Sequence, residues 1–361
     1  MPSDNGSGAA RAQGNGDVPN GLKLVPRGDV EYKMKDFKSD QEVRWCPGCG
    51  DYAILAAFQG FLPELGVPRE NIVIVSGIGC SSRFPYYLST YGMHSIHGRA
   101  PAIATGLAAS RPDLSVWVIT GDGDGLSIGG NHLIHALRRN VNINVLLFNN
   151  RIYGLTKGQY SPTSSRGMVT RSSPMGSLDS PFNPVSLALG AEAGFVARTI
   201  DSDRKHLTSV LRAAADHEGA SFVEIYQNCP IFNDDAFEPL KDPDERDTRL
   251  LRMEHGEPLR VGADRGVVAG EYGELTVADI AKVGEDRLIR HDAHREDSGY
   301  AFALSRLDFP AFEHVPVGVF RDIKRPTYDE LMADQLAAAE TTQGDGDLAA
   351  LLASGDTWTV G

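Results

Sequence analysis

The chain has 361 residues, of which 41% are hydrophobic and 23% are charged, and these values exclude a disordered chain and a collagen-like repeat. No apolar run approaches the ~20 residues that span a bilayer. The formal net charge of −13 argues against nucleic acid as the main partner, because phosphate binding needs concentrated positive charge. We therefore expect neither a membrane nor a nucleic-acid partner, and an acidic surface suits small-molecule chemistry.

Residues 1–30 contain almost no large apolar side chain, so nothing offsets the entropy cost of ordering them, and we expect a disordered tail. This segment has no apolar centre like that of a secretory signal, and it has too few basic residues for a transit peptide. The chain's four cysteines are too few for a disulfide-stapled secreted domain. We therefore expect a cytoplasmic protein with reduced thiols.

Short apolar runs alternate with helix-length amphipathic segments between residues 50 and 226, which is typical of strands buried on both faces of a parallel sheet. The predicted strands are 72–76, 116–120, 143–149 and 222–226. The predicted helices are 53–65, 101–110, 126–139, 184–194 and 205–217. This alternation predicts an α/β fold with a doubly wound, mainly parallel sheet that binds ligands at the carboxyl ends of its strands.

The character of the sequence changes after about residue 240, where charges are frequent, prolines are scattered and strand-like runs are few. We therefore expect three parts: the tail 1–30, a ligand-binding domain 31–240 and an irregular C-terminal extension 241–361.

Two polar motifs lie at the ends of neighbouring predicted strands. Gly121-Asp122-Gly123 follows one strand, Asn149-Asn150 ends the next, and residues 124–148 separate them. Mg²⁺ prefers oxygen ligands, and Asp122 can supply a carboxylate, Asn150 an amide oxygen and Ile152 a backbone carbonyl. Glycines let the backbone approach phosphates, and the following helix presents its positive end. Each motif alone is typical of a turn, but together they predict a site for Mg²⁺ and a diphosphate.

This pattern resembles the thiamine diphosphate enzymes, whose diphosphate-binding half carries GDG and then NN at a similar spacing. The resemblance implies a sheet of that diphosphate-binding type and assigns Asp122, Asn150 and Ile152 to Mg²⁺. It also implies contacts to the diphosphate of the cofactor from Gly123, Asp124, Gly154 and Leu155.

The four cysteines form a second group of candidate ligands. Cys46 and Cys49 form a C-x-x-C pair, and Cys80 and Cys229 each follow a predicted strand whose carboxyl end lies at the same sheet edge. Four gathered thiolates can hold either Zn²⁺ or a [4Fe–4S] cluster. Zinc ribbons usually have a second close pair, which is absent here, so the cluster is favoured. Alternatively, Cys80 and Cys229 are small buried residues beside a redox or zinc C-x-x-C pair.

A thiamine diphosphate site beside four cysteines resembles the β subunits of 2-oxoacid:ferredoxin oxidoreductases. The matching motifs are CPGCGD (46–51), GIGCSSR (77–83), HGRAPAIATG (97–106), GDGDG (121–125), NNRIYGLTKGQYSPTS (149–164) and NCPIFND (228–234). The resemblance spans roughly residues 36–240 and implies that this domain binds thiamine diphosphate, Mg²⁺ and one [4Fe–4S] cluster. It also implies that His97 hydrogen-bonds the diphosphate, and that the cofactor is lined by Ile78, Gly79, Cys80 and Ser81.

The family resemblance implies oxidative decarboxylation of a 2-oxoacid, transfer of the acyl group to coenzyme A, and single-electron transfer through the cluster to ferredoxin. The glutamate that activates the cofactor lies on a second domain, which this family carries on an α subunit. We therefore expect an α₂β₂ assembly and no activity of this chain alone. Three roles stay open for the extension 241–361: covering the cluster, contacting the α subunit and docking ferredoxin.

Substrate choice is expected to depend on the segment 153–159, which lines the substrate pocket in the family. A lysine at position 157 resembles the 2-oxoglutarate enzymes, whereas pyruvate enzymes usually have a small residue there. Lys157 can pair with the distal carboxylate that pyruvate lacks, and an unpaired cation in a partly dry pocket disfavours pyruvate. We therefore predict that 2-oxoglutarate is converted to succinyl-CoA, with pyruvate or a broad range of 2-oxoacids as the alternative.

Two other functions fit part of the pattern. A thiamine diphosphate decarboxylase or synthase without redox chemistry would hold no iron–sulfur cluster, and a zinc-bearing scaffold subunit would hold zinc without sulfide. Analysis of metal and acid-labile sulfide separates these alternatives from the favoured function.

Overall fold

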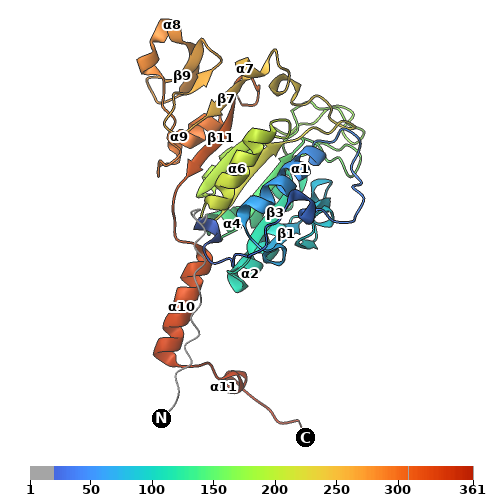
Figure 1. The fold of residues 1–361 in the computed structure, drawn as a ribbon, viewed down its shortest axis with the longest axis vertical. Helices are drawn as coiled ribbons and strands as arrows, with labels where there is room; N and C mark the ends of the chain where they lie inside the picture. Colours follow the sequence, from blue (N-terminus) through green and yellow to red (C-terminus); the bar gives the residue numbers. More distant parts are fainter. Residues whose placement is uncertain (1–19, 308, 361) are drawn as a thin grey trace.

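The computed structural model describes residues 20–307 and 309–360, which are built around an eight-stranded sheet (Figure 1). The strand order is β2-β1-β3-β4-β6-β5-β11-β7. These strands are β1 (Ile72–Ser76), β2 (Tyr91–His94), β3 (Ser115–Gly121), β4 (Asn144–Asn149), β5 (Phe195–Ile200), β6 (Ser221–Tyr226), β7 (Leu250–Met253) and β11 (Val315–Asp322). All neighbouring strands are parallel except β5 and β11. The predicted α/β fold with a mainly parallel sheet is confirmed.

The predicted strands agree closely with the structure: β1 has the predicted bounds, and β3, β4 and β6 differ from the prediction by at most one residue at an end. The prediction missed β5, because Arg198 and Thr199 interrupt its apolar run. Both side chains are nevertheless buried. Arg198 donates from Nε to Oε2 of Glu224 on β6 at 2.7 Å, so a buried ion pair links the two strands where apolar residues are expected.

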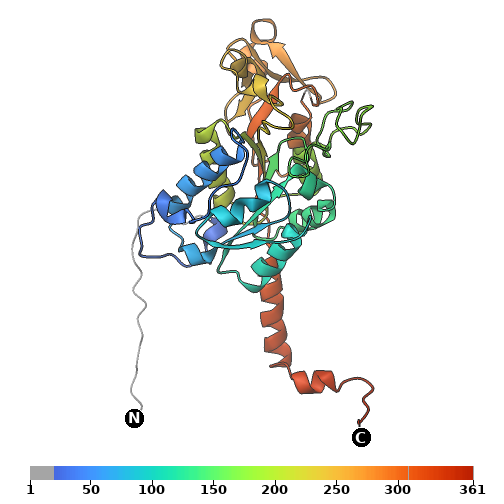
Figure 2. The same cartoon turned by 90° about the vertical axis from the view of Figure 1, so that its right-hand side faces the viewer.

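Helices cover both faces of the sheet (Figures 1 and 2). They are α1 (Asp51–Phe61), α2 (Ala100–Ser110), α3 (Asp122–Leu126), α4 (Gly130–Arg138), α5 (Pro184–Gly190), α6 (Arg204–Asp216), α7 (Arg246–Arg249), α8 (Ile280–Val283), α9 (Gly299–Ser305), α10 (Tyr328–Gln343) and α11 (Leu348–Leu352). The 3₁₀ helices are η1 (Asn20–Leu22), η2 (Met34–Phe37), η3 (Leu62–Leu65), η4 (Arg69–Asn71), η5 (Ser81–Tyr87), η6 (Glu238–Leu240) and η7 (Glu285–Arg287). The buried residues of α1 and α6 belong to one hydrophobic cluster, and those of α2, α4, α5 and α9 belong to another.

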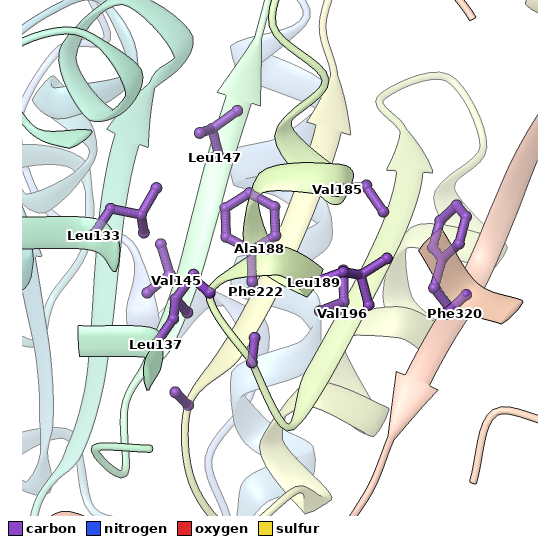
Figure 3. Packing of buried hydrophobic residues seen from close by; sticks show 14 of the residues in the cluster. Leu133, Leu137, Val145, Leu147, Val185, Ala188, Leu189, Val196, Phe222 and Phe320 are labelled. Atoms are coloured by element: carbon purple, nitrogen blue, oxygen red, sulfur yellow. The ribbon is translucent and has the colours of Figure 1, made fainter. Parts of the chain in front are cut away.

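The second of these clusters holds β4, β5, β6 and β11 against α4 and α5 (Figure 3). Leu137 of α4, Val145 of β4, Leu189 of α5, Phe222 of β6 and Phe320 of β11 are all almost completely buried within it. Burying a side chain of this size stabilises the fold by about 1.5–3 kcal/mol. The cluster also includes Val116 and Val118 of β3, so it fixes both β3 and β4, whose carboxyl ends carry the polar motifs.

Aromatic side chains pack on the face covered by α1. Phe84 of η5 makes edge-to-face contacts with Phe58 of α1 and Phe148 of β4, with ring centroids 5.4 and 5.6 Å apart. Trp117 of β3 packs edge to face against Phe58 at 5.1 Å. Such pairs stabilise beyond the area they bury. They anchor η5, and with it Cys80 directly before it, to the sheet.

The described part of the N-terminal segment does not form the predicted tail. Leu22 and Val25 are only 2% and 5% exposed and belong to the same hydrophobic cluster as residues of α1 and α6. The tail prediction is therefore wrong for these residues, because two apolar side chains are enough to fix a short segment on an existing core. Residues 1–19 of the predicted tail lie outside the described residues.

The region after residue 240 is more regular than its composition indicates. β7 and β11 join the main sheet, and β11 was missed because Pro316 and Gly318 interrupt its apolar run. A separate antiparallel sheet contains β8 (Arg260–Val261), β9 (Arg265–Ala269) and β10 (Leu275–Asp279). Beyond these strands, α10 and α11 project from the body (Figures 1 and 2). Within residues 20–307 and 309–360, no helix has both the length and the apolar character needed to cross a bilayer.

Candidate active site

A cavity of about 400 Å³ lies at the carboxyl ends of β1, β3 and β4. Its lining includes all nine residues predicted to contact the cofactor, namely Ile78, Gly79, Cys80, Ser81, His97, Gly123, Asp124, Gly154 and Leu155. The predicted Mg²⁺ ligands also line it: Asp122, Asn150 and Ile152. Loops that are far apart in the sequence therefore meet around one cavity.

Gly123 packs directly beneath the ring of Tyr153. A β-carbon at position 123 would lie 2.2 Å from Cε1 of Tyr153, which is much closer than any van der Waals contact. The hydroxyl of Tyr153 donates to the carbonyl oxygen of Gly123 at 3.0 Å. The central motif therefore needs glycine for packing inside the protein as well as for any approach to a phosphate.

Asp122 is a buried carboxylate held by two hydroxyl groups. Its Oδ2 accepts hydrogen bonds from Ser161 Oγ at 2.5 Å and from Thr163 Oγ1 at 2.6 Å. Burial raises the pKa of Asp122 to about 6, although both hydrogen bonds act in the opposite direction. The side chain is thus oriented by its neighbours, and its negative charge still needs a positive partner.

The turn after β4 is fixed by the two asparagines. Oδ1 of Asn149 accepts from the backbone N of Arg151 at 3.1 Å. It also lies 2.9 Å from Thr163 Oγ1, whose one hydrogen is donated to Asp122 at the shorter distance. Oδ1 of Asn150 accepts from the backbone N of Ile152 at 3.2 Å. Arg151 has a left-handed backbone with φ of 59°, which is uncommon for a bulky residue. These contacts hold Asn150 and Ile152 in the cavity wall.

The carboxylate of Asp124 is used inside the protein. Its Oδ1 accepts from the backbone N of Ile78 at 3.1 Å and of Gly98 at 2.7 Å, and its Oδ2 accepts from Thr120 Oγ1 at 2.8 Å. It therefore joins the loop after β1 to the loop before α2. We assign this carboxylate a positioning role, which leaves the backbone of Asp124 for the predicted contact with a diphosphate.

The two residues predicted to act on the diphosphate or substrate differ in their positions. His97 lines the cavity and is exposed. Lys157 is also exposed, has a left-handed backbone with φ of 75°, and does not line the cavity, although Thr156 and Gln159 do. The contact of Lys157 with a substrate stays a prediction.

The four cysteines are free thiols that lie close enough to interact electrostatically, and Cys80 among them lines the cavity. A β-carbon on Gly154 would lie 3.5 Å from Sγ of Cys229 and 3.6 Å from Sγ of Cys80, so both sulfur atoms contact the same loop. Burial raises the pKa values of Cys49, Cys229 and Cys80, the last to about 12. Charge on neighbouring thiolates, including Cys46 toward Cys80 and Cys229, raises them further. Thiols placed in this way need a positive centre to ionise.

Trp45 and the C-x-x-C turn support this group of thiols. Nε1 of Trp45 donates to the carbonyl oxygen of Cys80 at 2.7 Å, and its ring packs against Tyr87 at 4.8 Å. The backbone N of Cys49 donates to the carbonyl oxygen of Cys46 at 3.1 Å. Among residues 20–307 and 309–360, no three histidine, cysteine, aspartate or glutamate side chains are placed to hold a single metal ion.

Several residues that build this site were not predicted from the sequence. Ser161 and Thr163 lie inside the quoted motif 149–164, but their contact with Asp122 depends on the path of a loop. Asp51 and Gln227 line the cavity and are each only 1% exposed. Burial raises the pKa of Asp51 to about 7, although a side-chain hydrogen bond with Cys49 lowers it, and Asp201 adds a smaller increase. Oδ1 of Asp51 has no hydrogen-bond partner among the described residues. An acidic residue two positions after Cys49 was the available signal.

The chain is similar in sequence to known proteins. Residues 77–225 match the family described as "Thiamine pyrophosphate enzyme, C-terminal TPP binding domain". The 2-oxoglutarate oxidoreductase subunit KorB of Mycobacterium tuberculosis is 64% identical over 340 residues, which are 93% of this chain and 91% of that protein. The 2-oxoacid:ferredoxin oxidoreductase subunit beta of Sulfolobus sp is 47% identical over 192 residues, which are 53% of this chain and 63% of that protein.

The fold is also similar to a solved structure, the 2-oxoglutarate:ferredoxin oxidoreductase from Magnetococcus marinus with 2-oxoglutarate, coenzyme A and succinyl-CoA bound. The TM-score is 0.71 at 35% identity, and the match covers 90% of this chain and 97% of that chain. The likeness therefore extends well beyond the thiamine-binding segment. The chain belongs to the β subunits of the 2-oxoacid:ferredoxin oxidoreductase family, as its motifs predict.

Proposed function

We propose that this chain is the β subunit of a 2-oxoglutarate:ferredoxin oxidoreductase, which forms succinyl-CoA and CO₂ and passes electrons to ferredoxin. The observation that carries the proposal is the shared position of Cys80, which lines the cavity of the GDG and NN motifs and also belongs to the group of four thiols. The choice of 2-oxoglutarate is supported by the name of the Mycobacterium tuberculosis relative and by the compounds bound in the solved structure.

The residues present fit the cofactors of such an enzyme. Asp122 offers a buried carboxylate, and Asn150 and Ile152 add neutral oxygens, as Mg²⁺ requires. The four thiols offer the sulfur ligands that a [4Fe–4S] cluster takes, and the absence of a second close C-x-x-C pair from the sequence favours the cluster over zinc. When bound, thiamine diphosphate supplies an electron sink for decarboxylation, and the cluster accepts electrons one at a time.

The chain's own residues prepare this chemistry. Ser161 and Thr163 orient Asp122 toward a cation, and Asp124 fixes the loops on either side of the diphosphate. Ile78 and Phe148 make part of the cavity wall apolar, which limits the access of water to the reacting atoms. The chain supplies a preorganised half of the site, and we propose that the activating glutamate comes from the α subunit.

We further propose an α₂β₂ assembly in which residues 241–361 make subunit contacts. Residues 327–361 contain seven acidic residues and no lysine or arginine, and α11 exposes Leu348, Leu351 and Leu352. An acidic segment with exposed leucines suits a basic, partly apolar surface on the α subunit. The free cysteines favour a reducing, cytoplasmic setting.

Coexpression with the α subunit and anaerobic purification test this function. The complex should reduce a viologen dye in a reaction that needs both 2-oxoglutarate and coenzyme A, and it should contain iron and acid-labile sulfide. Zinc without sulfide would indicate a scaffold subunit, and decarboxylation without dye reduction would indicate a thiamine enzyme without redox function. Equal rates with pyruvate would overturn the choice of 2-oxoglutarate.

Lys157→Met is expected to raise the KM for 2-oxoglutarate by about 10–100-fold, because the substituted side chain keeps its length but loses the charge that pairs with the distal carboxylate. The rate with pyruvate, which lacks that carboxylate, should change little. Lys157→Arg is the control, since it retains a cation. Steady-state kinetics on both acids provide the measurement, and an equal loss with both would refute the role of Lys157.

Thr163→Val is expected to weaken Mg²⁺-dependent binding of thiamine diphosphate by about 10–100-fold, which is typical when the support of a metal ligand is removed. Valine keeps the shape of threonine but removes the hydroxyl that donates to Asp122 and lies 2.9 Å from Oδ1 of Asn149. Thr163→Ser keeps that hydroxyl and should bind nearly normally. Mg²⁺ titrations followed by circular dichroism of the cofactor measure the effect, and equal affinities in the two variants would contradict it.

Mg²⁺ affinity is expected to fall about tenfold per pH unit below about pH 6 and to level off above it. The sign follows from Asp122: burial raises the pKa of this carboxyl to about 6 in the metal-free protein, and a proton must leave before the cation binds. Calorimetric titrations of Mg²⁺ in buffers of different pH give the profile. A flat profile across pH 5 to 7 would show that Asp122 is not the ligand.

A further inference from the structure

Gln227 lies between the cofactor cavity and the cysteines. It directly follows β6, is 1% exposed, and lines the cavity. Its backbone N donates to the carbonyl oxygen of Asn149 at 3.0 Å, which ties it to the NN motif. At the other end of the residue, the side-chain Nε2 lies 3.2 Å from Sγ of Cys49. One buried glutamine thus contacts both halves of the site.

The hydrogen bonding of Gln227 determines which end of its amide faces the sulfur. Nε2 also lies 2.5 Å from the carbonyl oxygen of Asn228, and a carbonyl oxygen can only accept a hydrogen bond. The group facing Asn228 must therefore be the NH₂ rather than the amide oxygen. Because the same nitrogen faces Cys49, its second hydrogen is directed to a sulfur that, as a thiolate, can only accept.

This donor is distinctive among the contacts of the cysteines. Within residues 20–307 and 309–360, Gln227 is the only side chain that donates to a cysteine sulfur. The other donors are backbone amides, namely that of Asp51 toward Cys49 and those of Ile231, Phe232 and Asn233 toward Cys229. Backbone donors are present whatever the side chain at their positions. The donor of Gln227 exists only because position 227 is a glutamine.

We propose that Gln227 raises the reduction potential of the [4Fe–4S] cluster by an N–H···S hydrogen bond to Cys49, an inference that rests on the proposed function. Reduction adds one electron, and part of that negative charge is carried by the thiolate sulfurs. A donor aimed at one of these sulfurs stabilises the reduced form more than the oxidised form. Gln227 is a positioning residue: it acts through Cys49, and it makes the cluster a better acceptor for electrons from the cofactor side.

The test uses the anaerobically purified αβ enzyme and two substitutions. Gln227→Met keeps the length of the side chain without a donor, and Gln227→Glu keeps its shape but places oxygen atoms against the sulfur. Gln59→Met is the matched control, since Gln59 is also buried but donates to the carbonyl oxygen of Tyr87. Redox titrations followed by electron paramagnetic resonance measure the midpoint of the cluster, alongside its iron and sulfide content.

At a fixed solution potential near the midpoint, Gln227→Met should lower the ratio of reduced to oxidised cluster by about three- to tenfold, where tenfold corresponds to 59 mV for one electron. Gln227→Glu should lower it further, and Gln59→Met should leave it unchanged. Full iron and sulfide with an unshifted midpoint in both Gln227 variants would overturn the inference. Loss of the cluster in both would also overturn it, because the side chain would then hold the site together rather than tune it. Absence of iron and sulfide from the wild-type enzyme would instead refute the proposed function.

Discussion

Asp122→Asn is expected to weaken the binding of Mg²⁺ and thiamine diphosphate by more than about 100-fold, beyond the about 10–100-fold typical of residues that only support a metal ligand. The substitution removes the buried negative charge that we assign to the cation and keeps the shape of the side chain. With the hydroxyls of Ser161 and Thr163 still in place, little else in the cavity changes. Titration of the cofactor at several Mg²⁺ concentrations measures the loss, and high Mg²⁺ should partly restore binding.

Asp124→Asn is the matched control for this prediction. The amide oxygen of asparagine can still accept from the backbone of Ile78 and Gly98, and its NH₂ can donate to the hydroxyl of Thr120. Its effect on affinity should therefore be much smaller than that of Asp122→Asn. Equal losses in the two variants would show that the two carboxylates do not have the separate roles that their contacts indicate.

Cys229→Ser is expected to remove the iron–sulfur cluster and to lower 2-oxoglutarate-dependent dye reduction by more than about 100-fold, because a serine hydroxyl is a much poorer iron ligand than a thiolate. Thiamine diphosphate should still bind, since Cys229 does not line the cavity. Iron and sulfide analysis, the brown absorption of the cluster and cofactor titration test the three parts of this prediction.

The separation of these effects is the informative result. All four cysteines of the chain are assigned to the cluster, so no other cysteine can serve as a control. Retained binding of thiamine diphosphate by the Cys229→Ser variant is the control instead. A Cys229→Ser enzyme with full iron and normal dye reduction would show that the cluster lies elsewhere. An enzyme that loses the cofactor together with the iron would show that Cys229 is needed for the fold of the whole site.

The site combines features that are unfavourable for the protein by itself. Asp51 and Asp122 are buried carboxylates with raised pKa values, the thiols resist ionisation, and Arg151 has a left-handed backbone. Such features are retained where the surrounding structure holds them and where they serve a function. A divalent cation would offset the negative charge of the carboxylates, and an iron cluster would offset that of the thiolates.

Much of the fold could be predicted from the sequence. The run IVIVS became β1 with the predicted bounds, and the GDG and NN motifs lie at the ends of the adjacent strands β3 and β4. These features are encoded locally, because a strand buried on both faces needs a continuous apolar run, and turns need glycine and asparagine. The gathering of residues from four loops at one edge also followed, since parallel strands bring their carboxyl ends together.

Other features were decided only by the tertiary structure. β5 and β11 could not be predicted from apolar runs, because β5 contains polar residues and β11 contains a proline and a glycine. A buried ion pair stabilises β5, and pairing with β7 stabilises β11. Three contacts of the site join residues that are far apart in the sequence. They are the hydrogen bonds of Thr163 to Asp122, of the Gly98 backbone to Asp124 and of Gln227 to Cys49. Hydrogen bonds depend on distances of a few tenths of an ångström and on direction, and only the packed chain sets these. The sequence by itself thus determined which ligands are available and at which sheet edge they lie, whereas the packing determined which neighbours orient each of them.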